Sequence, residues 1–184
     1  MKEQIILTGF LFGVAVLAVI NKSLVLPGQS LQLLWLALGG VVGWHLIWFD
    51  VIAFVYILHP EAQVSQYIQF QINNRRFKKA AEMVALRIGE FDKLTTRSVL
   101  FQFAWVVLTV FTLTSTAGWF GKTMIMTLGL HILIDQWQMY LKNETEALKK
   151  QLFWQIQRPV SDKELKLYLY VLSGVFLWFV LILI

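Results

Sequence analysis

The apolar segment from Leu31 to Leu58 constrains the fold of this chain more than any other feature. It contains a single formal charge, Asp50, and a single histidine, His45. As an α-helix it would be roughly 42 Å long, at about 1.5 Å of rise per residue. The hydrocarbon core of a bilayer is about 30 Å thick. The segment therefore predicts a helix that crosses a membrane with length to spare.

The composition of the whole chain points the same way. The 184 residues are 58% hydrophobic and 15% charged, with a mean hydropathy of +0.64. Soluble domains are nearer 45–50% apolar and about 25% charged. A chain of this size cannot bury so much apolar surface in its own core, so lipid is the expected solvent for much of it. Cysteine is absent, which excludes disulfides and thiolate metal sites.

The apolar segments predict an all-α fold, a polytopic membrane helical bundle that forms one integral membrane domain. About five transmembrane helices are expected, at 5–20, 31–58, 98–119, 123–141 and 167–184. Residues 142–158 read as a polar continuation of the fourth helix. Ser161 and Glu164 have the spacing of a capping box, which predicts that the last helix begins there.

Basic residues set the expected orientation. The connections at 59–97 and 142–166 hold most of the 16 Lys and Arg residues, which predicts that both are cytoplasmic. The N-terminus would then be cytoplasmic and the C-terminus outside, in a plasma or inner membrane. Because the basic residues flank apolar segments, this rule accounts for the net charge of +5, and a nucleic-acid partner is not expected.

The first cytoplasmic connection carries an expected amphipathic helix. Its apolar residues fall at helical spacing, at Phe77, Ala81, Val84, Ile88 and Phe91. Basic residues surround this face, at Arg75, Arg76, Lys78 and Lys79. Such a helix either lies on the membrane or packs on other helices, and its basic face is expected to meet anionic lipid head groups.

Two pairs of glycines have the four-residue spacing that allows helices to approach closely in a membrane. These pairs are Gly9 with Gly13 and Gly39 with Gly43. On a helical wheel Gly39, Gly43 and Asp50 share one face, which is expected to contact protein. Such a face suits packing within the bundle, a homo-oligomer or a membrane-protein partner.

Polar side chains form stripes on two further segments. Gln102, Thr109 and Thr112 lie on one face of 98–119, and Thr127, His131 and Asp135 lie on one face of 123–141. The four-residue spacing of His131 and Asp135 lets the carboxylate orient the imidazole, and Asp50 is expected at a similar depth. Three interpretations stay open for these groups: structural hydrogen bonding, a proton or cation pathway, and a metal or haem ligand.

The sequence leaves three function classes. The first is a non-enzymatic binding, scaffold or assembly module, favoured because packing alone explains the few polar groups. The second is a small proton or cation transporter or channel that uses Asp50, His131 and Asp135. The third is an intramembrane metal or haem site on His45 and His131, because two histidines from two helices suit a haem. No nucleophile motif or nucleotide loop is recognisable, so an enzyme is not favoured.

Overall fold

The computed structural model describes residues 2–20, 29–86, 94–156 and 159–183, and these residues contain helices and connections but no strand. The elements in chain order are α1 (Lys2–Ile20), α2 (Gln29–Ala53), the π-helix η1 (Phe54–Leu58), α3 (Gln63–Asn73), α4 (Phe77–Leu86), α5 (Val99–Thr114), α6 (Trp119–Leu141), α7 (Thr145–Phe153) and α8 (Asp162–Leu183). The all-α fold expected from the sequence is confirmed.

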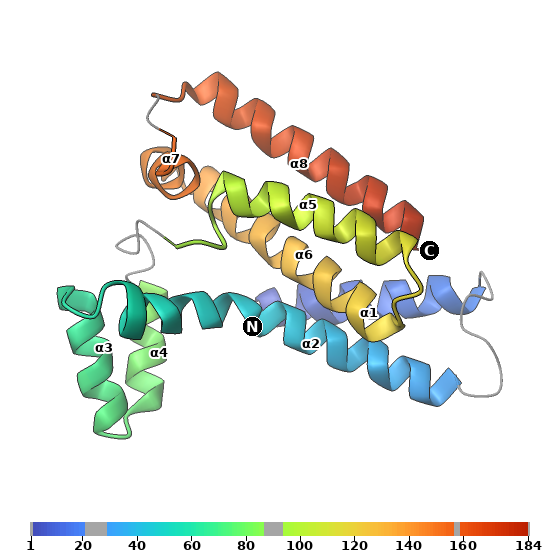
Figure 1. The fold of residues 1–184 in the computed structure, drawn as a ribbon, viewed down its shortest axis with the longest axis horizontal. Helices are drawn as coiled ribbons and strands as arrows, with labels where there is room; N and C mark the ends of the chain where they lie inside the picture. Colours follow the sequence, from blue (N-terminus) through green and yellow to red (C-terminus); the bar gives the residue numbers. More distant parts are fainter. Residues whose placement is uncertain (1, 21–28, 87–93, 157–158, 184) are drawn as a thin grey trace.

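Helix α6 is the centre of the molecule. It contacts α2, α5, α7 and α8, and α1 lies against α2 (Figure 1). Most of its middle is buried, including Met126, Leu128 and Ile132 in the main core cluster. Because protein surrounds this helix, it can carry polar side chains that a helix facing an apolar solvent could not. Its polar residues are consistent with this central position.

Glycines bring α2 and α6 into close contact. A Cβ atom on Gly39 would lie 2.2 Å from the carbonyl oxygen of Phe120, and one on Gly43 would lie 2.1 Å from that of Met124. Any larger residue would therefore push the two backbones apart. Gly9 and Gly13 differ from this pair, since no heavy atom lies within 4 Å of their Cβ positions. Within this chain they make no close helix contact.

Beyond η1 the chain forms a helical hairpin. Helices α3 and α4 run across the direction of α2 at one end of the molecule (Figure 1), and Arg75 makes the turn between them with a φ of 57°. Val64, Ile68, Ala80 and Val84 pack against the end of α2 and η1.

The buried face of α4 differs from the face predicted by the sequence. Val84 is buried as expected, but Ala80 takes the place expected for Ala81, and Phe77 is 63% exposed. The expected apolar positions Ile88 and Phe91 lie outside the described residues. The difference arises because α4 packs on α3 and η1 through its Ala80 side.

Helix α7 is separate from α6, so the expected continuation of α6 through residues 142–158 is wrong. Asn143 has a φ of 59°, the left-handed conformation in which helices commonly end. The predicted capping box at the start of α8 is confirmed, because the Ser161 N–H donates to Glu164 Oε2 (2.9 Å) and the Glu164 N–H donates to Ser161 Oγ (3.3 Å).

A salt bridge connects α7 to α8. Lys149 Nζ lies 2.7 Å from Asp162 Oδ1 and 2.8 Å from Glu146 Oε1. The hydrogen bond to Asp162, followed by the one to Glu146, raises the pKa of the Lys149 amine.

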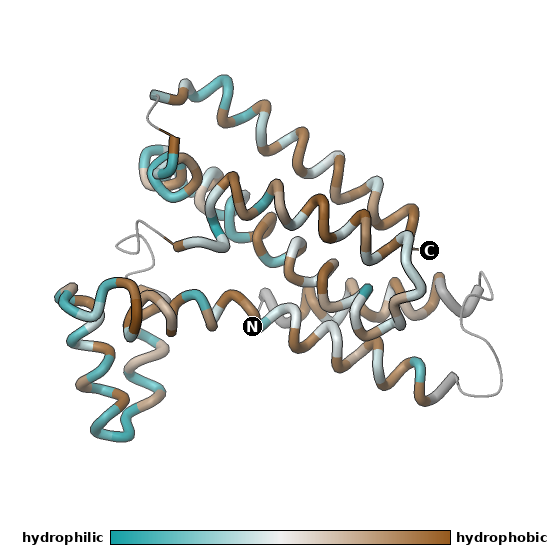
Figure 2. The backbone as a smooth tube through the Cα atoms, in the orientation of Figure 1, coloured by the Kyte–Doolittle hydropathy of each residue, from teal (hydrophilic) through white to brown (hydrophobic). Residues whose placement is uncertain are grey.

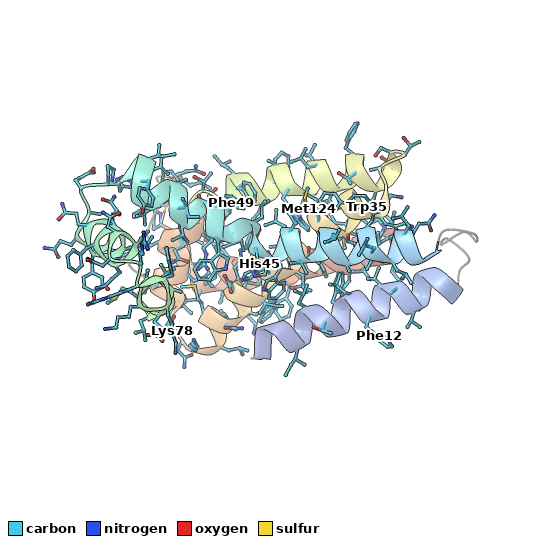
Figure 3. All side chains as sticks on the ribbon, turned by 90° about the horizontal axis from the view of Figure 1, so that it is seen from below. Phe12, Trp35, His45, Phe49, Lys78 and Met124 are labelled. Atoms are coloured by element: carbon cyan, nitrogen blue, oxygen red, sulfur yellow. The ribbon has the colours of Figure 1, made fainter. Side chains whose placement is uncertain are left out.

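Hydropathy is uneven along the molecule. Among the described residues, Leu31–Leu58 and Asp162–Leu183 are long and apolar enough to cross a membrane by length and composition. Hydrophilic residues gather in α3, α4 and α7, at one end (Figure 2). Large apolar side chains are exposed elsewhere, such as Phe12 (71%) and Phe49 (65%), labelled in Figure 3.

The connection between α5 and α6 lies earlier in the chain than expected. Helix α5 ends at Thr114 rather than at 119, and α6 begins at Trp119 rather than at 123. Ser115 accounts for part of this difference, because its hydroxyl accepts the Ala117 N–H (3.2 Å) in place of a helical carbonyl.

Candidate functional site

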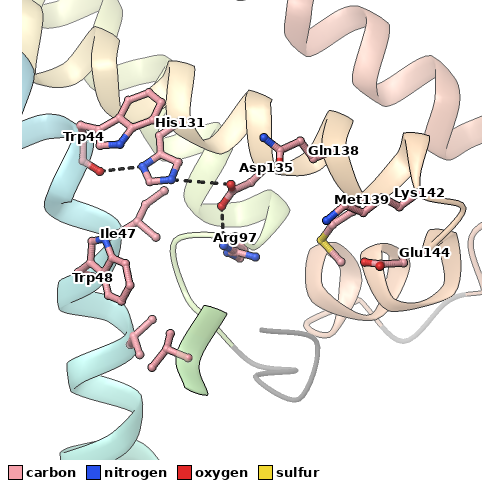
Figure 4. A pocket seen from close by; sticks show the side chains of 12 residues that line it. Trp44, Ile47, Trp48, Arg97, His131, Asp135, Gln138, Met139, Lys142 and Glu144 are labelled. Carbon is pink, nitrogen blue, oxygen red and sulfur yellow. Dashed lines mark hydrogen bonds and ion pairs between the residues drawn. The ribbon is translucent and has the colours of Figure 1, made fainter. Parts of the chain in front are cut away.

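His131 lies at the contact between α6 and α2. Its ring stacks on Trp44, with 4.3 Å between the ring centroids and 14° between the planes. Its Nδ1 atom lies 2.7 Å from the Trp44 carbonyl oxygen. A carbonyl oxygen can only accept, so Nδ1 carries the hydrogen of this bond. Nε2 is then directed to Asp135, 3.7 Å from its Oδ1 (Figure 4).

Asp135 pairs with Arg97, a residue just before α5. Arg97 Nη2 donates to Asp135 Oδ2 at 2.5 Å, and Arg97 Nη1 lies 3.4 Å from Gln151 Oε1. Arg97 is only 8% exposed. A buried guanidinium requires a compensating carboxylate, and Asp135 supplies it.

Further hydrogen bonds connect this ion pair to α5 and α8. The Gln102 side chain donates to the Arg97 carbonyl oxygen (3.0 Å), and the Tyr168 hydroxyl donates to Gln102 Oε1 (2.5 Å). Together with Gln151 on α7 and Asp135 on α6, the network therefore joins four helices around Arg97. Gln102 is 1% exposed, so its two partners satisfy an amide that water does not reach.

The segment from Leu94 to Ser98, here called the clasp, connects α2 to α6. The Thr96 N–H and hydroxyl both donate to Asp50 Oδ2, at 2.8 and 2.7 Å. The next residue, Arg97, binds Asp135. Ser98 then caps α5 by accepting the Phe101 N–H (3.2 Å). Two consecutive residues thus bind the carboxylates of two different helices, and the α5 cap fixes their position.

A cavity of about 250 Å³ opens beside these groups, between α2 and the second half of α6. In Figure 4 apolar side chains line its α2 side, and its α6 side is lined by Met139 and by charged or polar side chains. The lining comprises Trp44, Ile47, Trp48, Val51, Val84, Arg97, His131, Asp135, Gln138, Met139, Lys142 and Glu144.

The other expected polar residues lie elsewhere. His45 is exposed, and its Nδ1 atom lies 2.8 Å from the Val41 carbonyl oxygen. The hydroxyls of Thr109, Thr112 and Thr127 each donate to a carbonyl of their own helix, four residues back.

These positions bear on the expected sites. His45 and His131 share no partner, so the geometry gives a bis-histidine site no support. No group of three or more His, Cys, Asp or Glu residues suited to a metal occurs within the described ranges. Asp50 was expected at a depth similar to that of Asp135, and the two carboxylates bind consecutive residues of the clasp, Thr96 and Arg97.

The basic residues expected at a membrane surface lie around the tip of the α3–α4 hairpin. The side chains of all four, Arg75, Arg76, Lys78 and Lys79, are exposed. Lys78 is labelled on the hairpin in Figure 3.

Sequence reasoning did not find the partners of the two carboxylates. Arg97 was read only as one of the basic residues that orient the chain, and Thr96 was not singled out. One feature of the sequence could have indicated these partners. Ser98 is a strong N-cap residue, which places residues 96 and 97 directly before the start of a helix, where they can reach the helices packed against it.

Comparisons with known proteins add no assignment. No protein-family model matches the chain, and neither the curated proteins nor the solved structures give a significant match.

Proposed function

We propose that this chain is a multi-pass membrane protein that acts as a non-enzymatic binding or scaffold module. In this proposal α1, α2 with η1, α5, α6 and α8 cross the membrane. The connections at 59–97 and 142–166 are cytoplasmic, so the C-terminus lies outside. The exposed apolar side chains of α1, α2, α5 and α8 support a lipid environment, because large apolar patches are rare on proteins in water.

The observation that carries the functional part is the clasp. Asp50 and Asp135, the carboxylates that a transporter would use, each have partners from the same short segment. A proton or cation pathway requires such groups to change partners during transport. The ion pair of buried Arg97 with partly buried Asp135 instead favours a fixed arrangement that holds α2, α5 and α6 in place. The adjacent cavity then has a rigid wall, as a binding site requires.

The α3–α4 hairpin supports the expected association with anionic lipid head groups. It runs across the direction of α2 (Figure 1), so in the proposed orientation it would lie along the cytoplasmic surface. Phe77 and Phe70 are 63% and 58% exposed beside the basic residues of its tip. Exposed aromatic rings next to basic side chains are typical of interfacial helices.

Flux measurements test this function against the transporter alternative. Wild-type protein in liposomes that hold a pH-sensitive dye and a cation gradient is expected to give no flux above that of empty liposomes. Protein-dependent flux that Asp135→Asn abolishes, while the variant stays folded, would contradict a binding module and support transport. Resistance of the chain to extraction from membranes by alkaline carbonate is the accompanying test of membrane insertion.

A further inference from the structure

We propose that the cavity beside the clasp holds the head group of a single phospholipid that carries both a phosphate and an ammonium group. One acyl chain of the same lipid would lie in an apolar groove next to this cavity. The inference rests on the proposed membrane location and names the ligand class of the proposed binding module.

The first observation is that the cavity adjoins an apolar groove. The groove measures about 150 Å³ and lies between α2, η1 and the α3–α4 hairpin. Its lining is apolar apart from the indole nitrogen of Trp48 and the hydroxyl of Tyr56. Trp48, Val51 and Val84 line both spaces, so the cavity and the groove are neighbours across a shared apolar edge. A ligand that occupies both must be polar at one end and apolar at the other.

The second observation is the balance of charge at the polar end. Arg97 and Asp135 compensate each other there. Lys142 and Glu144 also line the cavity, at exposed positions, and neither side chain forms an ion pair with another described residue. A purely anionic head group would bring a second negative charge close to Glu144, and a purely cationic one would bring a second positive charge close to Lys142. A head group with a phosphate for Lys142 and an ammonium for Glu144 complements both charges.

The third observation is the position of these groups along the molecule. Lys142 is the C-cap of α6, and Glu144 is the N-cap of α7. In the proposed orientation they lie at the cytoplasmic end of α6, the depth at which phosphates of the inner leaflet are found. Trp48, which is 39% exposed between the two spaces, suits the boundary between head groups and acyl chains.

Native mass spectrometry of the full chain tests the proposal. Protein in mild detergent is stripped of lipid and then mixed with dioleoyl phosphatidylethanolamine, dioleoyl phosphatidylglycerol or glycerophosphoethanolamine, which has no acyl chains. We expect one phosphatidylethanolamine per chain to be retained. Phosphatidylglycerol, which lacks the ammonium group, should be retained less, and glycerophosphoethanolamine should not be retained.

Two variants probe the two ends of the site. Lys142→Gln removes the phosphate partner and should lower lipid retention about fivefold, since a basic residue near a lipid surface is worth about 1 kcal/mol. Ala81→Phe should also lower retention, because Ala81 lines the groove and its exposed position leaves the core unchanged. The matched controls are Lys163→Gln and Ala104→Phe, at exposed positions that line neither space. Ala81→Ser, which leaves the groove open, should retain lipid.

Each contrary result has a defined meaning. Equal retention of phosphatidylethanolamine and phosphatidylglycerol would overturn the proposed head group, and equal losses in the variants and their controls would overturn the site. A chain that resists carbonate extraction but retains no lipid would refute this inference and leave the proposed function standing. A chain that carbonate removes from membranes would refute both.

Discussion

Arg97 donates to groups from two helices while it is almost completely buried. Its pairing with Asp135 is therefore different in kind from the exposed pairs of Lys149. Exposed ion pairs contribute about 0–1 kcal/mol. A largely buried charge that loses its partner costs far more, because its remaining contacts replace the lost carboxylate only in part. The residues of the clasp are thus expected to dominate the effects of single substitutions.

A double-mutant cycle tests the Arg97–Asp135 pair. Asp135→Leu strands the guanidinium and should lower the free energy of unfolding by about 3–5 kcal/mol. Arg97→Met combined with Asp135→Leu should cost less than Asp135→Leu alone, because no buried charge is left uncompensated. Reversible unfolding in mixed detergent micelles measures these values, with Lys149→Met as the exposed-pair control. Additive effects of the two substitutions would show that the pair is not coupled.

Thr96 offers a second test at the same scale. Thr96→Val keeps the shape of the side chain and the backbone N–H but removes the hydroxyl donor to Asp50. The loss should lower the free energy of unfolding by about 1–3 kcal/mol, because the buried carboxylate loses a hydrogen bond. Thr96→Ser retains the hydroxyl and serves as the control. If Thr96→Val is as stable as Thr96→Ser in the same unfolding assay, the hydroxyl contributes nothing.

At the scale of elements, α2 and α6 form the central pair of the fold. Their backbones approach at Gly39 and Gly43, and His131 and the clasp join them further along. The four-residue spacing in the sequence indicates such a contact but gives no partner helix. The same spacing at Gly9 and Gly13 leads to open space instead. Which pair packs depends on the residues opposite, and a single helix does not contain that information.

Alanine substitutions distinguish the two pairs of glycines. Gly43→Ala places a methyl group against the Met124 carbonyl oxygen and should lower the free energy of unfolding by about 1–3 kcal/mol. Gly13→Ala meets no neighbour and should raise it by about 0.5–1 kcal/mol, since alanine favours the helix over glycine. Unfolding titrations of both variants measure the difference. A stable Gly43→Ala variant would indicate that the two helices can separate at little cost.

For the whole molecule, periodicity and composition predicted the all-α class and most of the long helices. They could not predict the separation of α7 from α6, because that break depends on the left-handed backbone of one residue, Asn143. Nor could they predict the clasp. His131 and Asp135 are four residues apart on one helix, so their proximity follows from helical geometry alone. The contacts of Arg97 and Thr96 join residues that tertiary packing alone brings together.

Cysteine labelling tests the proposed orientation, and the absence of native cysteine makes single reporters clean. Asn74→Cys and Ser161→Cys are exposed positions in the proposed cytoplasmic connections, and Thr116→Cys is exposed between α5 and α6. An impermeant maleimide should label Thr116→Cys in intact cells. It should label the other two only after permeabilisation. The reverse pattern would show that the chain is inserted the other way round.

The clasp also has a consequence for how the chain is made. Asp50 and Thr96 are separated by 46 positions, and Arg97 and Asp135 by 38. During synthesis Arg97 must therefore leave the ribosome well before Asp135. Helix α5 is then complete while the Arg97 guanidinium still lacks the Asp135 carboxylate. In the proposed orientation, a cation at that point would hold the start of α5 on the cytoplasmic side until α6 arrives. The same arginine that joins the finished helices would thus first act as a signal for the orientation in which they insert.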